Sequence, residues 1–74
     1  MRAYVDTGKE LVVVEATEVV YDKKDSQLIV KTNPVSRLTV GMPLTEAKQY
    51  LTTLAEKGFA FIHRDDCKVQ GSML

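Results

Sequence analysis

The sequence lacks most features that stabilise or anchor a small protein. Its 74 residues include no tryptophan, two prolines, one histidine and one cysteine, Cys67. A single cysteine excludes a disulfide within the chain, and no Cys/His cluster is present to hold zinc. The longest aliphatic run, residues 11–14, is far below the about 18 residues that cross a bilayer, and no stretch is typical of a signal peptide. We therefore expect a cytoplasmic protein without membrane association.

An excess of one charge is also missing. Ten Lys and Arg balance ten Asp and Glu, which gives a formal net charge of zero. Domains that bind nucleic acids often have an isoelectric point above about 9, whereas this sequence has a value near 6.5. Nucleic-acid binding would thus require a local basic cluster.

The length allows one domain over residues 1–74. A domain of this size buries only about 60% of the surface that its unfolded chain exposes, so its core is thin. Without a disulfide or a metal, packing or self-association must supply the stability, and we expect a homodimer. The expected seam is a strand of the valine-rich N-terminal half, which contains Val12, Val14 and Val19.

Alternation and β-branched residues predict short strands along most of the chain. A turn at residues 6–9 joins the first two strands, and a bend or a bulge near residues 15–18 interrupts the second. The last strand is apolar throughout, which favours burial on both faces. Residues 67–74 are expected to be a frayed C-terminal tail. The predicted strands are residues 2–6, 10–16, 19–21, 28–32, 37–40 and 59–62.

One helix is predicted over about residues 43–57. Pro43 suits a first helical turn, and Gly58 suits the residue that ends a helix. The expected fold is α+β, with a small antiparallel β-sheet of about five or six short strands and this helix packed on it. One apolar stripe would face the sheet: Leu44, Ala47, Leu51, Leu54 and Ala55.

The residues that carry enzyme chemistry are not assembled in this sequence. No G-x-S-x-G motif surrounds a serine, and Cys67 lies in no catalytic cysteine signature. His63-Arg64-Asp65 has the letters of the protein-kinase catalytic loop, but the other parts of a kinase are missing. We expect no catalysis, no metal site and no cofactor.

Basic residues near loops are the candidates for DNA contact. Neighbouring aspartates such as Asp22, Asp25 and Asp65 would cancel much of their field, so solvated loops are the alternative. The six candidates are Lys23, Lys24, Lys31, Arg37, His63 and Arg64.

A short motif follows the predicted helix. Phe59, Ile62, His63 and Arg64 match in register the pattern F-x-R-x-H-R-S. The helix roughly fits the preceding segment, sL-x-e-L-e-x-x-L, through Leu44, Glu46 and Leu51. Over about residues 11–66, this order of elements resembles the LytTR family of bacterial transcription-regulator DNA-binding domains. The resemblance implies a β-rich fold and DNA binding.

The chain departs from that family at informative positions. Phe61 stands where the motif has arginine, Asp65 stands where it has serine, and the sequence ends before the family's last strands, which carry part of its DNA-contacting surface. Only His63 and Arg64 carry over position by position. Two hypotheses therefore remain open. The first is a shortened LytTR-like regulator that contacts phosphates. The second is a protein-interaction module without nucleic-acid binding, which dimerises, pairs through a strand edge or binds another regulatory protein.

Overall fold

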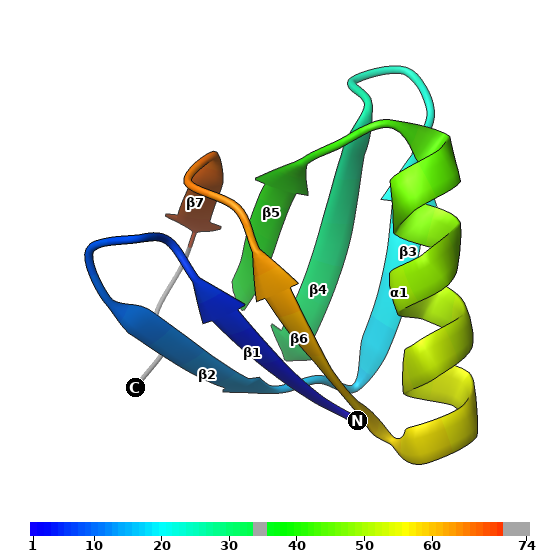
Figure 1. Ribbon diagram of the computed structural model, residues 1–74, viewed down its shortest axis with the longest axis horizontal. Helices are drawn as coiled ribbons and strands as arrows, with labels where there is room; N and C mark the ends of the chain where they lie inside the picture. Colours follow the sequence, from blue (N-terminus) through cyan, green and yellow to red (C-terminus); the bar gives the residue numbers. More distant parts are fainter. Residues whose placement is uncertain (34–35, 71–74) are drawn as a thin grey trace.

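The computed structural model describes residues 1–33 and 36–70 (Figure 1). These residues form seven short strands and one helix, so the predicted α+β class is confirmed. The helix α1 spans Leu44–Lys57 and begins one residue after its predicted start. The strands are β1 (Arg2–Asp6), β2 (Leu11–Glu15), β3 (Glu18–Asp22), β4 (Gln27–Asn33), β5 (Ser36–Gly41), β6 (Phe59–His63) and β7 (Cys67–Gln70).

The strands lie in two sheets rather than one. A three-stranded sheet has the order β2-β1-β6, and a four-stranded sheet has the order β3-β4-β5-β7. The β1 and β6 strands pair in parallel, and the other pairings are antiparallel. Figure 1 shows the three-stranded sheet in front of the other, with α1 along one side of both. The parallel pairing was not expected, because the strand that β6 joins is more than 50 residues away in the sequence.

A bend between β2 and β3 carries the chain from one sheet to the other. The backbone N–H of Ala16 donates to the carbonyl of Met1 at 2.6 Å, in the three-stranded sheet. The N–H of the next residue, Thr17, donates to the carbonyl of Lys31 at 2.8 Å, in the four-stranded sheet. Consecutive residues therefore bond to different sheets, and the predicted bend is confirmed.

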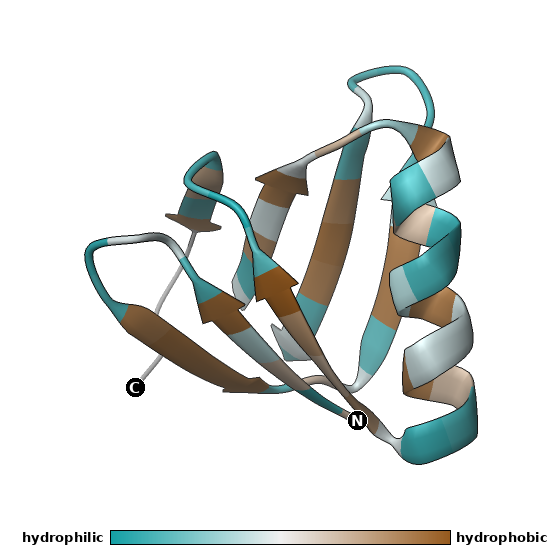
Figure 2. Cartoon of the chain, in the orientation of Figure 1, coloured by the Kyte–Doolittle hydropathy of each residue, from teal (hydrophilic) through white to brown (hydrophobic). Residues whose placement is uncertain are grey.

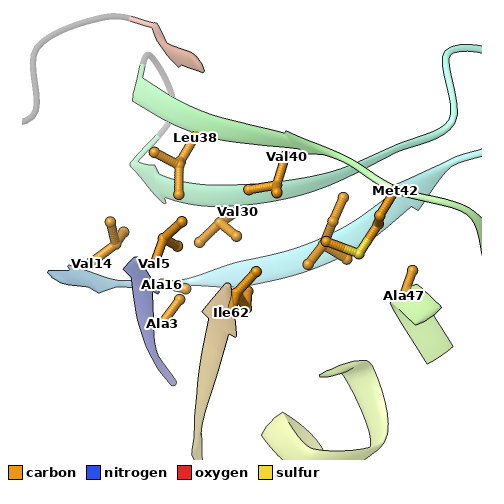
Figure 3. Close-up of a cluster of buried hydrophobic side chains, with 11 residues drawn as sticks. Ala3, Val5, Val14, Ala16, Val30, Leu38, Val40, Met42, Ala47 and Ile62 are labelled. Carbon is orange, nitrogen blue, oxygen red and sulfur yellow. The ribbon is translucent and has the colours of Figure 1, made fainter. Parts of the chain in front are cut away.

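The core fills the space between the sheets (Figure 3). Alternate residues of each strand point inward, as the twofold period of a strand requires. The three-stranded sheet contributes Ala3, Val5, Val14 and Ile62, and the four-stranded sheet contributes Leu28, Val30, Leu38 and Val40. Val14 is buried, and Val12 and Val19 pack partly buried against the same cluster. The three valines named for the predicted dimer seam thus contact the core, and the homodimer itself stays a prediction.

The helix closes one side of this core. Gly58 ends it in the left-handed conformation, with φ of 79°, and donates its N–H to the carbonyl of Leu54. Leu54 and Ala47 are buried, while Tyr50 and Leu51 pack partly buried against the cluster. Ala55 is exposed, so its assignment to the apolar stripe is wrong. The inward stripe has the helical spacing 47, 50, 51 and 54.

The C-terminal part of the chain also differs from the expectation. Cys67–Gln70 forms β7, which pairs with β5, so a frayed tail is wrong for these four residues. Residues 71–74 of the predicted tail lie outside the described residues. In β6, Phe59 and Phe61 are exposed, so burial on both faces is also wrong. Within residues 1–33 and 36–70, no helix is long and apolar enough to span a membrane.

Candidate interaction surface

The side of the three-stranded sheet that points away from the core carries an unusual set of residues. We call it the outer face. Its members are the residues of β1, β2 and β6 that alternate with the core positions, and they are half-buried or exposed. Figure 2 shows the apolar character of β2 and β6 in this sheet. The outer face consists of Arg2, Tyr4, Asp6, Leu11, Val13, Glu15, Phe59, Phe61 and His63.

Aromatic rings form the centre of the outer face. The rings of Tyr4 and Phe61 stack with centroids 4.6 Å apart and an interplanar angle of 16°. Phe59 meets Phe61 edge to face, at 6.2 Å and 88°. Phe61 is nevertheless 55% exposed and Phe59 42% exposed. The rings are therefore held in place by one another while solvent still reaches a large part of their surface.

The strand register orders the outer face into three rows that run across the strands. The middle row is apolar, because Tyr4 lies opposite Val13 on one side and opposite Phe61 on the other. Val13 is 53% exposed. This row joins one aliphatic and two aromatic side chains into a contiguous apolar group, and large exposed groups of this kind mark interaction sites.

The two rows on either side of the middle row carry opposite charges on β1. One row places Arg2 between Glu15 and Phe59, and the other places Asp6 between Leu11 and His63. Arg2 and Asp6 thus flank Tyr4 on the same strand, and the carboxylate of Glu15 lies beside Arg2 in its row.

Local contacts hold both charged groups in position. The Arg2 guanidinium forms an ion pair with Glu15 and donates a hydrogen bond to the hydroxyl of Tyr4 at 3.3 Å. The bonds to Tyr4 and to Glu15 raise the pKa of Arg2. One carboxylate oxygen of Asp6 accepts the N–H of Gly8 at 2.9 Å, in the β1–β2 turn. The other lies 3.5 Å from Nδ1 of His63.

The six predicted DNA-contacting residues are spread over three places. Lys23 and Lys24 lie in the β3–β4 turn, Lys31 and Arg37 lie opposite each other on β4 and β5, and His63 and Arg64 lie at and beyond the end of β6. The Lys23–Lys24 turn is shaped by Asp22, whose carboxylate accepts the N–H of Lys24 at 3.0 Å.

Carboxylates accompany several of these cations. The ammonium of Lys31 lies 3.3 Å from a carboxylate oxygen of Glu18, and His63 faces Asp6. Arg64 forms an ion pair with Glu46 in the first turn of α1, and both side chains are about two-thirds buried. Arg64 thus joins β6 to the helix. This ion pair gives Arg64 a structural role that does not depend on any DNA contact.

Other features of the molecule offer less to a ligand. No group of three or more His, Cys, Asp or Glu that could hold a metal ion occurs among the residues described. Burial raises the pKa of the Cys67 thiol, and the carboxylates of Asp66 and Glu10 raise it further. A thiol in such surroundings is less reactive than an ordinary one.

The outer face was not expected from the sequence. Only the period of two in Phe59-Ala60-Phe61-Ile62 distinguishes the large outward side chains from the inward ones, and a continuous apolar run hides it. Tyr4 and Val13 join the face through strand pairings that the sequence does not specify locally.

No protein family, curated protein or solved structure matches this chain. The resemblance to the LytTR family therefore stays a hypothesis.

Proposed function

We propose that this chain is a small non-catalytic interaction module that associates with a second copy of itself through the outer face. The observation that carries the proposal is the exposed middle row, Val13, Tyr4 and Phe61, with its stacked rings. Aromatic side chains are enriched at the centres of protein interfaces because their large rigid surfaces lose little conformational entropy when they are covered.

The charges of the outer face favour a protein partner over a nucleic acid. Aromatic residues on a sheet can stack on the bases of a single strand, but such sites also carry a positive groove for the phosphates. Here the permanent cation, Arg2, is already paired with Glu15, and Asp6 adds a second carboxylate. With two carboxylates and one permanent cation, the outer face repels a phosphate backbone more than it attracts one.

The area of the outer face limits the expected affinity of the dimer. Three strands of five residues cover about 16 Å along the strands and about 14 Å across them. This footprint of about 220 Å² on each copy is below the about 600 to 800 Å² that each partner buries in specific interfaces, so we expect a weak dimer with a dissociation constant on the order of 0.1 to 1 mM.

Sedimentation velocity over a range from a few micromolar to about a millimolar tests the proposal. We expect a dimer whose population rises with concentration. Phe61→Lys should abolish it, because the ammonium would be buried in the middle row. Val69→Lys is the matched control, since Val69 lies on β7, outside the outer face, and is 49% exposed. A strictly monomeric wild type, or a dimer that survives in Phe61→Lys, contradicts the proposal.

A further inference from the structure

We infer that the two copies pack face to face with their β1 strands antiparallel, so that Arg2 of each copy pairs with Asp6 of the other. The inference rests on the proposed function and adds to it the residues that fix the orientation and the choice of partner. It follows from the position of the two charges relative to the apolar row, which the strand register determines.

Two simple arrangements bring the middle rows together about a twofold axis. If the axis lies in the interface and runs along the strands, each row covers its own counterpart. Arg2 then faces Arg2, and Asp6 faces Asp6. If the axis lies in the interface and runs across the strands through Tyr4, the middle row covers itself and the outer rows exchange. Arg2 then faces Asp6 at both ends.

Electrostatics selects the second arrangement. Like charges placed opposite each other in an interface disfavour association, and opposite charges favour it and fix the register. The antiparallel arrangement replaces two like-charge contacts with two symmetry-related ion pairs. The middle row covers the middle row in both cases, but Val13 faces Phe61 of the other copy in the first arrangement, whereas each residue faces its own counterpart in the second.

The geometry of the side chains fits this pairing. Residues two apart on a strand lie about 7 Å apart, so Arg2 and Asp6 are equally far from Tyr4 and exchange places under the twofold rotation. Packed sheets lie about 10 Å apart, a gap that an arginine and an aspartate side chain can span together. A guanidinium carries five N–H donors, so Arg2 can keep its contacts to Glu15 and Tyr4 and still donate to a second carboxylate.

The pairing of Arg2 with Asp6 also contributes to the specificity of the interface. The order of Arg2 and Asp6 along β1 favours a second copy in the antiparallel sense. A flat apolar surface without that charge order covers the middle row but gives Arg2 and Asp6 no partner beyond those in their own copy. The charge order therefore favours a second copy of this chain as the partner.

Charge reversal tests the inference. Arg2→Glu should place two carboxylates at each end of the dimer, and Asp6→Lys should place two cations there. Each variant alone should self-associate about tenfold more weakly than the wild type, measured by sedimentation velocity. A 1:1 mixture should form a heterodimer at least as tight as the wild-type dimer, because both ends then carry opposite charges. Circular dichroism confirms that each variant is folded.

Two further variants distinguish a failure of the antiparallel pairing from a failure of the proposed function. Glu18→Gln removes the charge of a comparable exposed ion pair, with Lys31, that lies on β3 and β4 outside the outer face, and it should leave the dimer within about twofold of the wild type. Phe61→Lys reports on the outer face itself. If Phe61→Lys abolishes the dimer but the charge reversals do not change it, the antiparallel pairing is overturned and the proposed function stands. If Phe61→Lys leaves the dimer intact, both are overturned.

Discussion

Tyr4 and Phe61 stack their rings across two parallel strands, on the solvent side of the three-stranded sheet, with centroids 4.6 Å apart. Their neighbours along the strands, Val5 and Ile62, are fully buried on the other side. The same two strands therefore build the core with one face and an apolar surface with the other. This arrangement explains why a strand with an apolar residue at each of its first four positions need not be buried on both sides.

Helix packing can be tested with a pair of leucine variants. Leu54 is 2% exposed, whereas Leu51 is only partly buried. Leu54→Ala should lower the free energy of unfolding by about 2 to 5 kcal/mol, and Leu51→Ala should lower it by less. Urea denaturation followed by circular dichroism measures both. Equal losses, or a larger loss for Leu51→Ala, would show that the helix is rotated relative to the sheets.

The end of the helix gives a test of backbone conformation. Gly58 has φ of 79°, and an added Cβ would meet no atom within 4 Å. Gly58→Ala should therefore cost about 1 to 2 kcal/mol through backbone strain alone. Gly58→Asn should cost less, because asparagine tolerates the left-handed region. A loss in Gly58→Ala near zero in urea denaturation would contradict the left-handed helix end.

The reactivity of Cys67 depends on its surroundings. Burial raises the pKa of its thiol, with smaller contributions from Asp66 and Glu10, so less thiolate is present at a given pH than for an ordinary cysteine. Because the thiolate is the nucleophile, alkylation by iodoacetamide at pH 8 should be slower in the folded protein than in the protein unfolded by urea. Mass spectrometry gives both rates. Asp66→Asn should speed the folded reaction slightly, and equal folded and unfolded rates would refute the assignment.

Nucleic-acid binding separates the two functional hypotheses. Fluorescence anisotropy with a labelled DNA duplex at about 0.15 M salt should show no binding tighter than about 0.1 mM, because the six candidate residues are dispersed and Lys31, His63 and Arg64 each lie beside a carboxylate. Binding that weakens steeply with salt and is lost in Lys23→Ala/Lys24→Ala would support the LytTR-like hypothesis. Binding of a single-stranded oligonucleotide that is lost in Phe61→Ala would instead identify a stacking surface.

Local sequence patterns predicted the strands and the helix, but they did not predict which strands pair. Period-two patterns and turn residues located the strands, and Pro43 and Gly58 bracketed the helix to within one residue. The strand β7 was not predicted because Cys67–Gln70 is short and two of its four residues are polar. It is a strand because it pairs with β5. Likewise, β6 could not be assigned to β1 by any local signal, since that contact depends on where α1 returns the chain. The outer face exists only once those pairings are made.

In the proposed dimer, the outer face of one copy covers the outer face of the other. An isotope-filtered nuclear Overhauser experiment on a 1:1 mixture of ¹³C-labelled and unlabelled protein measures contacts between copies directly. We expect signals between the copies from the rings of Tyr4 and Phe61 and the methyl groups of Val13. We also expect signals between the side chain of Arg2 and the β-protons of Asp6. Signals confined to the backbone of β2 would show pairing through a strand edge instead, and that result would contradict this arrangement.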